Sequence, residues 1–367
     1  MLTASAEAGL IDQQEYFQKR IASHDLSHYY LLKRGDFAYN HSSSGSAALG
    51  IIKRLEAYDF GCLSTLYIIF HPKHGIDSDY LLHYFESSAW HGDVAGMVTE
   101  GARNHGLLNI SPDTFFTARC SFPSLPEQRR IGKFFTIFDS LIAAAERQET
   151  LLRRKKQAYL QLMFPREGET EPRLRFAGYN GEWERRQFGE LYVPSREKND
   201  GSFSTKDIIS VAGMRYASRE PADSSDDYMR TYNVMRVGDI AFEGNRSGNF
   251  SHGRFVENDL GDGIVSHVFV VLRPLPGRRY DLAFWKEAIH DEFLMRRILA
   301  RSTKRSTMMH EIVVPDFLKE IIRVPSLSEQ QKIGEFFTTL DSAIDTSRKR
   351  VELLKKQKSA YLQSMFI

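Results

Sequence analysis

The sequence has few cysteines and no long hydrophobic run. Its two cysteines, Cys62 and Cys120, are too few for a disulfide framework, which indicates a reducing compartment. The longest apolar runs, Leu66–Phe70 and Val268–Leu272, are far shorter than the roughly 20 residues of a membrane-spanning helix. The first residues show no basic-then-apolar signal pattern, so we expect a cytoplasmic protein with no membrane partner.

An excess of one charge sign is also missing. The 49 lysines and arginines nearly balance the 47 acidic residues, and the net charge of +2 by itself predicts no partner. A content of 42% hydrophobic and 26% charged residues is ordinary for folded proteins and excludes disorder and collagen-like repeats. At roughly 150 residues per domain, 367 residues suggest two or three domains.

An internal repeat dominates the sequence. Residues 123–164 align without a gap with residues 325–366 at an offset of 202, and 22 of the 42 positions are identical by direct count. Weaker echoes precede both copies, since Arg103 falls on Arg305 and Phe115 on Phe317. The chain is therefore a tandem duplication of a divergent domain followed by a nearly invariant segment. We expect the two divergent domains to recognise different targets. We expect the two repeated segments to bind the same partner, once each.

The repeated segments predict two long helices. Ser124 and Ser326 each precede a glutamate by three residues, which is the spacing of a capping box. Apolar residues then follow alternating steps of three and four, as in a coiled coil that pairs antiparallel with its duplicate. The expected seam residues are Ile131, Phe134, Phe138, Leu152, Tyr159, Ile333, Phe336, Leu340, Leu354 and Tyr361. The alternative is two unrelated helices that each pack on their own domain.

Positive charge gathers in these helices. By direct count, residues 123–164 carry a net charge of +4 and residues 323–367 a net charge of +3, chiefly through the runs at 153–156 and 355–358. One interpretation is a solvated face near a helix C-terminus, where cations suit the helix dipole. The other is a basic surface that faces a polyanion.

The repeated pattern resembles a known family. PSLxEQxxIGxFFxxxDxxI followed by LLxxxKxAYLQxMF, present twice, is similar to the repeated regions of the specificity (S) subunit of type I restriction–modification systems. The linker PRLRFxGYxGEW at residues 172–183 resembles the start of a target-recognition domain in that family.

This resemblance implies a non-catalytic DNA reader. In the family, each globular domain reads one half of a split DNA sequence, while the helix pair sets the spacing and docks modification (methyltransferase) subunits, which restriction subunits then join. S-adenosylmethionine, ATP and magnesium belong to those partners, so we expect no cofactor in this chain. The sequence contains no Asn-Pro-Pro-aromatic methylation motif and no Walker A loop. Its histidines lack cysteine partners at zinc spacing, so we expect no metal site.

The first domain departs from the family pattern. Some 26 residues from Trp183 to Ile208, together with the linker, have no counterpart in the first copy, because Ile209-Ser210-Val211 aligns with Leu2-Thr3-Ala4. We therefore expect a target-recognition domain that is truncated at its N-terminus.

Two stretches of the second domain are candidate DNA contacts. A glycine-rich loop at residues 244–249 carries Asn, Arg and Ser, the donors that read base edges in a groove. A basic stretch at residues 296–305 contains no acid and suits phosphate contacts. The alternatives are an ordinary polar hairpin loop for the first stretch and a purely structural role for the second. The candidates are Asn245, Arg246, Ser247, Asn249, Arg301, Lys304 and Arg305 in this domain, and Asn40, His41, Ser43, Arg103 and Asn104 at the corresponding places of the first domain.

The fold that we expect is α/β, with two mixed-sheet target-recognition domains separated by an antiparallel coiled coil of two long helices with pseudo-two-fold symmetry. The expected boundaries are 1–122 and 183–322 for the recognition domains, 123–164 and 323–367 for the helices, and 165–182 for the linker. The predicted function is sequence-specific binding of double-stranded DNA within a type I complex. The alternative is a protein-interaction scaffold, or a silent specificity cassette, that does not read DNA on its own.

Overall fold

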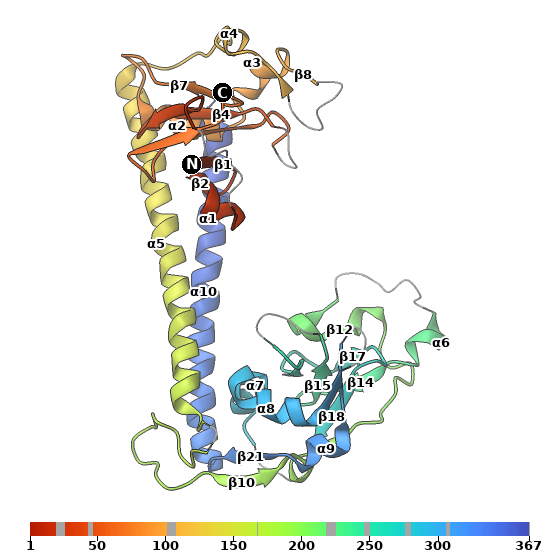
Figure 1. Ribbon diagram of the computed structural model, residues 1–367. Coiled ribbons are helices and arrows are strands. Elements are labelled where there is room, and N and C mark those ends of the chain that lie inside the picture. The colour runs from red at the N-terminus through yellow and green to blue at the C-terminus, as the bar shows by residue number, and fades with distance from the viewer. Residues whose placement is uncertain are drawn as a thin grey trace. The chain divides into compact units, whose positions relative to one another are not determined.

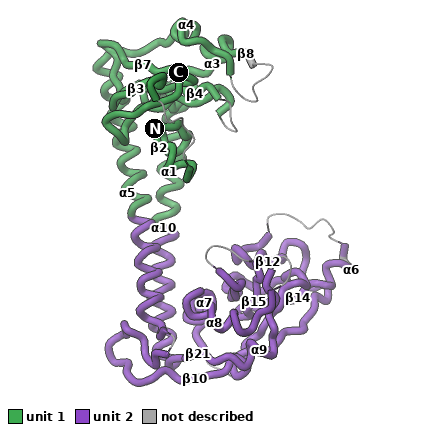
Figure 2. Tube along the Cα trace, in the orientation of Figure 1, with its two compact units in different colours: residues 1–147, 347–367 green, residues 148–346 purple. Residues whose placement is uncertain are grey.

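A computed structural model of the chain describes residues 1–19, 26–42, 47–100, 108–166, 168–217, 225–245, 250–275, 280–305 and 309–366. The chain divides into two compact units (Figure 2). Unit 1 comprises Met1–Arg147 and Ser347–Ile367, and unit 2 comprises Gln148–Thr346. Two long helices, α5 (Leu125–Met163) and α10 (Leu327–Met365), contribute to both units (Figure 1).

Unit 1 is a mixed α/β unit built on a three-stranded antiparallel sheet with the order β5-β4-β7. Phe37 and Tyr39 from β4 are fully buried, and they pack with Trp90 and Phe115. Before α5 its elements are β1 (Leu2–Ser5), β2 (Gly9–Asp12), α1 (Gln13–Phe17), β3 (Tyr30–Lys33), β4 (Phe37–Asn40), β5 (Ile51–Arg54), β6 (Phe60–Leu63), β7 (Ile68–Phe70), α2 (Ser78–Glu86), α3 (His91–Ala95), β8 (Thr99–Glu100), β9 (Leu108–Asn109) and α4 (Pro112–Phe115).

Unit 2 has a four-stranded antiparallel sheet with the order β11-β18-β15-β16. Its core is rich in aromatic residues, among them the fully buried Phe188, Phe255 and Phe317. Its elements before α10 are β10 (Glu184–Gln187), η1 (Phe188–Glu190), β11 (Tyr192–Pro194), η2 (Thr205–Asp207), β12 (Ile209–Ser210), η3 (Val211–Gly213), β13 (Arg215–Tyr216), α6 (Asp226–Met229), β14 (Asn233–Met235), β15 (Ile240–Glu243), β16 (Arg254–Glu257), β17 (Gly263–Val265), β18 (Val270–Pro274), α7 (Leu282–His290), α8 (Glu292–Ser302), β19 (Thr303–Arg305), β20 (His310–Ile312), α9 (Val314–Lys319) and β21 (Ile321–Val324).

The two predicted long helices are confirmed, and they run antiparallel in each unit. In unit 1 Phe134, near the start of α5, packs on Tyr361, near the end of α10, with ring centroids 5.3 Å apart. In unit 2 the duplicated pair, Tyr159 and Phe336, makes the same edge-to-face contact at 5.0 Å. The α/β fold with a pair of long helices was therefore predicted correctly.

The predicted capping box is wrong in the second copy. The Ser326 hydroxyl accepts a hydrogen bond from the Glu329 backbone N–H at 3.4 Å, as a cap does. The Glu329 carboxylate does not turn back to the helix end, because Arg175 from the linker binds both of its oxygens at 2.7 and 2.8 Å. A tertiary ion pair therefore replaces half of the local motif.

Each long helix begins against the first turn of a domain helix, and this contact requires a glycine. Asp281 caps the N-terminus of α7 and lies directly on Gly334, where an added Cβ would stand 2.2 Å from the Asp281 carboxylate. In unit 1 Asp77 caps α2 and lies on Gly132 in the same way. The glycines that the repeat shares are thus contact points between helices.

Candidate nucleic-acid interface

The glycine-rich loop of unit 2 connects β15 to β16. Gly244 leaves β15 so close to the β19–β20 hairpin that an added Cβ would stand 1.9 Å from the His310 carbonyl oxygen. The predicted contact Asn245 is exposed. The other predicted loop contacts, Arg246, Ser247 and Asn249, lie outside the described residues.

The fold brings this loop next to part of the basic stretch. The His310 backbone N–H donates to the Gly244 carbonyl at 2.8 Å, which joins the loop to strand β20. Strand β20 pairs antiparallel with β19, which carries the exposed side chains of Lys304 and Arg305. The start of the glycine-rich loop and the hairpin that carries Lys304 and Arg305 therefore form one surface, which we call the loop–hairpin junction (residues 244–245, 303–305 and 310–312).

Arg301 is engaged elsewhere. Its guanidinium binds the Glu320 carboxylate, with Nε 2.9 Å from Oε1. The side chain is 56% exposed, so it contacts solvent and the carboxylate together. An anion at Arg301 would have to compete with Glu320, whereas Lys304 and Arg305 have no such carboxylate among the described residues.

Unit 1 repeats the junction with its own residues. His41 directly follows β4, and its carbonyl accepts from the Leu108 N–H at 2.9 Å, as Gly244 accepts from His310 in unit 2. The His41 Nδ1 also lies 2.6 Å from the Leu108 carbonyl oxygen, so the ring is held at the base of the junction. Asn40 ends β4 and accepts a hydrogen bond from the Ser42 N–H. The predicted contacts Ser43, Arg103 and Asn104 lie outside the described residues.

A second glycine closes each loop. Gly50 and Gly253 both adopt positive φ angles, +76° and +79°, a conformation that favours glycine. A Cβ on Gly50 would stand 2.2 Å from the Asn40 carbonyl oxygen, and a Cβ on Gly253 would stand 2.6 Å from the Glu243 carbonyl oxygen. In both units a glycine therefore lies against the strand residue that precedes the loop, at the point where the loop returns to the sheet.

The predicted seam residues lie along the helix pair, most of them half-buried. Ile333 is buried, Tyr361 is 43% exposed, and the other eight are of intermediate exposure. The most buried positions of the two helices include neighbours that the sequence analysis did not choose: Phe135, Ile142, Leu160, Phe337, Ile344 and Val351. The helices thus pack on each other and on the domains together, which widens the buried stripe beyond a coiled-coil seam.

Each repeat also holds a half-buried lysine that binds two carboxylates. Lys358 in unit 1 places its ammonium 2.8 Å from Glu86 and 2.6 Å from Asp139. Lys156, its duplicate in unit 2, lies 2.8 Å from Glu287 and 2.7 Å from Asp341. Both lysines belong to the basic runs at 153–156 and 355–358, which were considered as a solvated or polyanion-facing surface. In the structure both instead bind carboxylates of the protein itself. Sequence reasoning missed these ion pairs, although the identity of the lysine and the aspartate in both repeats was the signal.

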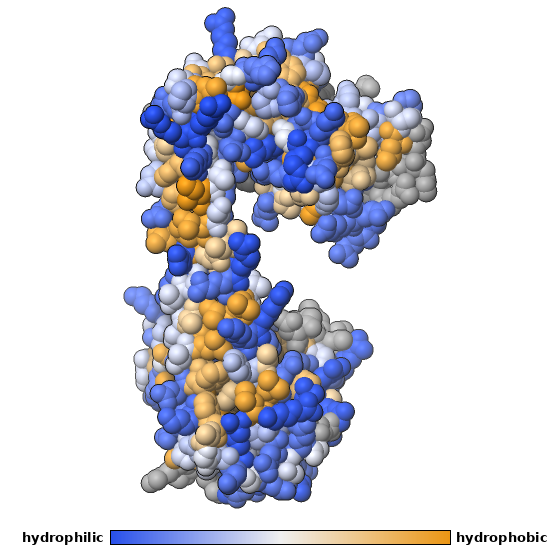
Figure 3. Space-filling view, turned by 90° about the vertical axis from the view of Figure 1, so that its left-hand side faces the viewer, coloured by the Kyte–Doolittle hydropathy of each residue, from blue (hydrophilic) through white to orange (hydrophobic). Residues whose placement is uncertain are grey.

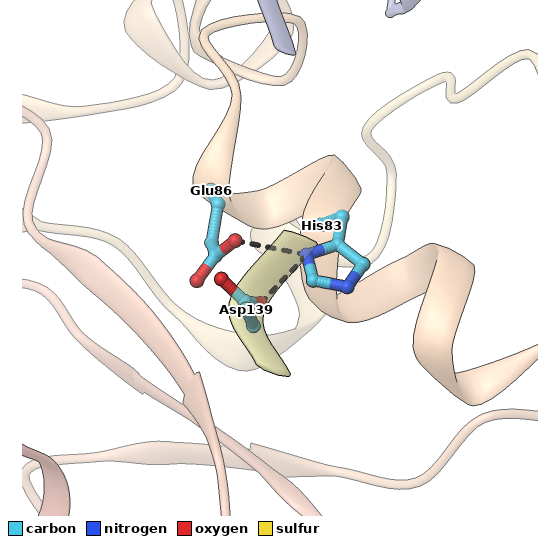
Figure 4. A group of neighbouring side chains, drawn as sticks. All are labelled: His83, Glu86 and Asp139. Carbon is cyan, nitrogen blue, oxygen red and sulfur yellow. Dashed lines mark hydrogen bonds and ion pairs between the residues drawn. The ribbon is translucent and has the colours of Figure 1, made fainter. Parts of the chain in front are cut away.

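Figure 4 shows the carboxylates of the unit 1 cluster with His83. The ligand atoms of His83, Glu86 and Asp139 lie within 4.8 Å of one another, as in a metal site. The positive charge there is supplied by Lys358, and in the duplicate cluster of unit 2 Lys156 binds the two carboxylates of Glu287 and Asp341. Burial raises the pKa of Glu86, but hydrogen bonds from His83 and Lys358 outweigh burial and bring the pKa to about 2. The arrangement therefore ties a domain helix to the long helices through charge.

Hydrophobic side chains remain exposed along the long helices. Figure 3 shows them in orange along α5 and α10. The most exposed large aliphatic ones are Ile137, Leu141, Leu151 and Leu353, between 43% and 56% exposed. Such a stripe is typical of a surface that binds another protein.

Among the described residues, no helix is both long and apolar enough to cross a membrane.

Comparisons with known proteins identify the family. A family model for the type I restriction modification DNA specificity domain matches residues 180–356. The specificity subunit of the type I restriction enzyme MjaVIII from Methanocaldococcus jannaschii is 23% identical over 319 residues, which cover 81% of this chain and 72% of that subunit. Residues 180–356 thus match the DNA specificity domain of type I restriction–modification systems, and the chain as a whole is similar to a specificity subunit, so the resemblance drawn from the repeats is confirmed.

Solved structures agree on the fold. The S subunit of a type I restriction–modification system from M. genitalium superposes with a TM-score of 0.51 at 12% identity, covering 93% of this chain and 85% of that one. A chain from a structural study of complex assembly and conformational transition of the type I R-M system gives 0.53 at 14% identity, with coverages of 94% and 84%.

Proposed function

We propose that this chain is the DNA sequence-specificity subunit of a type I restriction–modification complex, in which the recognition domains 1–122 and 183–322 each read one half of a bipartite site. The loop–hairpin junction is the observation that carries this proposal. It combines exposed Asn245 at the start of the loop with exposed Lys304 and Arg305 on the adjoining hairpin, and its backbone hydrogen bond recurs in unit 1. Phosphate contacts would set affinity, and the loop would set the sequence.

The repeated helices, 123–164 and 323–367, are assigned the spacing between the half-sites and the docking of modification subunits. Their exposed leucines and isoleucine offer apolar area for such partners. The linker 165–182 connects the two copies. Restriction subunits join the assembled complex. S-adenosylmethionine, ATP and magnesium act in those partners, and this chain contributes no catalytic residue. The cytoplasm is the proposed location, as expected from the first residues and the two cysteines.

Selection from randomised duplex DNA, with the chain and its modification subunit present, tests this function. We expect an enriched site with two fixed half-sites at a fixed gap. Substitution of Lys304 and Arg305 together by alanine should weaken binding to all sequences while the enriched site stays the same. If the complex assembles but no sequence is enriched, the chain is a scaffold and does not read DNA.

A further inference from the structure

The arm by which the glycine-rich loop returns to β16 is anchored on unit 2. The Phe250 ring contacts the Arg254 guanidinium, 4.9 Å from the ring centroid, and the His290 ring, whose centroid is 5.1 Å away. The Ser251 backbone N–H and hydroxyl both donate to Glu292 Oε1 on α8, at 3.1 and 2.8 Å. The backbone that leads into the next residue is therefore held by two side-chain contacts and two hydrogen bonds.

That next residue, His252, lies at the loop–hairpin junction. Its ring centroid is 5.3 Å from that of His310 on β20. His310 lies opposite Arg305 in the hairpin, next to Lys304 on the same strand. The His252 side chain is of intermediate exposure, and no described residue binds its Nε2 atom. An imidazole with one unengaged nitrogen thus lies beside the two proposed phosphate contacts.

The hydrogen bonds of Ser251 decide which nitrogen of His252 carries the proton. The Ser251 Oγ lies 2.8 Å from His252 Nδ1 and 2.8 Å from Glu292 Oε1. A carboxylate oxygen only accepts, so the single hydroxyl hydrogen of Ser251 points to Glu292, and the Ser251 oxygen accepts from the Nδ1–H of His252. In the neutral ring Nε2 is then an acceptor, and it becomes a donor only when the ring takes up a second proton.

Contact with a phosphate requires this second proton. Phosphate oxygens accept hydrogen bonds, so they are unfavourable partners for the Nε2 of a neutral ring, whereas an imidazolium Nε2–H donates a charge-assisted hydrogen bond to them. An unperturbed histidine titrates at a pKa of about 6.5, so an adjacent anion is sufficient to charge it near neutral pH.

The charged groups around His252 favour its protonation in a DNA complex. On the neighbouring elements they are Glu292 on α8 and, on the hairpin, Lys304, Arg305, His310 and Glu311. On its own arm, Arg254 is paired with Glu243 at 2.6 Å. The exposed hairpin cations oppose a charge on the ring until a phosphate neutralises them, and Glu292 then supports that charge through Ser251.

Unit 1 also has a histidine with one committed nitrogen at its junction. The Nδ1 of His41 lies 2.6 Å from the Leu108 carbonyl oxygen, which only accepts, so Nδ1 carries the proton there too. No described residue binds the Nε2 of His41. The two units reach this arrangement through different hydrogen bonds.

We propose that His252 is a phosphate-binding residue of unit 2 and that its Nε2 takes up a proton from solvent when the DNA backbone docks at the loop–hairpin junction. Ser251 and Glu292 are positioning residues, because they orient the ring through Nδ1. The proposal rests on the proposed function and deepens it: one contact with a DNA phosphodiester forms only together with one bound proton, so it is lost as the pH rises.

DNA titrations of the chain with its modification subunit, on the selected duplex at constant salt, test the proposal between about pH 6 and pH 8. We expect the affinity to fall with rising pH, by up to about tenfold per pH unit more steeply than in His252→Ala. The variant should bind several-fold more weakly at the low end of this range and equally well at the high end, with unchanged half-sites. Calorimetry in two buffers of different ionisation enthalpy should show that the variant takes up fewer protons, by up to about one.

A second variant and a control accompany these titrations. Glu292→Gln keeps an oxygen that accepts from Ser251 but removes the charge, so the fall in affinity should move to lower pH. This variant keeps the test valid if His252→Ala disturbs the loop. His74→Ala is the matched control and should behave as the unaltered chain, because His74 is exposed and follows β7 at the end of the unit 1 sheet away from the junction.

Two results would overturn this proposal alone. One is equal pH dependence and equal proton uptake in the unaltered chain and in His252→Ala. The other is a change of the enriched bases in His252→Ala without a change in proton uptake, because the neutral ring would then read a base edge. An assembled complex that binds no duplex at any pH would instead overturn the proposed function, and this proposal with it.

Discussion

Glu257 is a buried carboxyl group of unit 2. Its side chain is 2% exposed on β16, and neither carboxyl oxygen has a hydrogen-bond partner. Burial, assisted by the nearby Asp259 carboxylate, raises the pKa of Glu257 to about 9. The folded protein therefore holds a proton that the unfolded chain releases near pH 4.5, and this residue lowers the stability as the pH rises from about 4.5 to about 9.

Glu257→Gln should increase the free energy of unfolding at pH 7 by up to about 3 kcal/mol, because the amide carries no proton to lose. The gain should shrink towards zero at about pH 3.5, below the unfolded-state value of 4.5, where the carboxyl is largely protonated in both states. Urea unfolding at the two pH values measures the difference, with the exposed Glu311→Gln as control. A gain that is equal at both pH values would contradict the assignment.

Lys304 and Arg301 differ in their freedom to bind a phosphate. Lys304→Ala should weaken DNA binding alike for all sequences and reduce the salt dependence by about one phosphate contact. Arg301→Ala should have a smaller effect, because Glu320 already engages that guanidinium. Arg246→Ala, in the loop beyond the described residues, should instead relax the preference at one or two bases, at a cost of about 1–3 kcal/mol. Titrations at several salt concentrations, on specific and unrelated duplexes, separate the three outcomes.

At the scale of elements, the repeat preserves the contacts that seat a domain on a long helix. Gln330 accepts from the Asp281 N–H at the first turn of α7 and donates to the Pro325 carbonyl. Gln128 makes the same two bonds with Asp77 and Pro123. The sequence identity between the two repeats is thus explained in part by this contact between a domain helix and a long helix, which forms in both units. A shared partner is not the only explanation.

Gly334→Ala should therefore destabilise the protein. In an exposed helix this change would stabilise by about 1 kcal/mol. Here the new Cβ meets the Asp281 carboxylate and the Phe284 backbone nitrogen at 2.2 and 2.9 Å, so we expect a loss of about 1–3 kcal/mol. Thr338→Ala, at an exposed position of the same helix, is the control for helix propensity. Thermal unfolding of both variants shows whether each change stabilises or destabilises the protein. A stabilised Gly334→Ala variant would contradict the close contact between α7 and α10.

The helix pair also permits a test of its length. Four residues inserted after Arg147 and after its duplicate position, Lys349, lengthen both helices by about 6 Å and a little more than one turn. Both insertions are needed because α5 and α10 are bonded near this point, where Lys355 binds Glu146 at 2.8 Å. If the helices set the spacing, the preferred gap should grow by roughly two base pairs while the half-sites stay the same. Selection from duplexes with a gap of random length measures this, and an unchanged gap in a folded variant would refute the spacing role.

At the scale of the whole molecule, the chain has the architecture of a reader that works with other subunits. We expect the purified chain alone to transfer no methyl group from S-adenosylmethionine and to cut no DNA. Addition of the modification subunit should restore methylation at the selected site. Radiolabelled methyl transfer, with and without that subunit, is the measurement. Methylation by the single chain would overturn the assignment of all chemistry to its partners.

The sequence by itself determined the duplication, the two long helices and the family. These follow from patterns that are contiguous along the chain, because helical hydrogen bonds join residues four apart and a gapless repeat needs no structure to be recognised. The basic stretch and the glycine-rich loop were likewise visible as local composition.

Only the tertiary structure decided which of these residues act together. Local charge did not distinguish Lys156, which is bound by Glu287 and Asp341, from a lysine that faces solvent. The Glu329 carboxylate of the predicted capping box binds Arg175 instead of the helix end. The Gly244 carbonyl at the start of the loop accepts a hydrogen bond from His310 in the β19–β20 hairpin. Each of these contacts links residues far apart in the sequence, and its free energy depends on burial and geometry that only the packed chain creates.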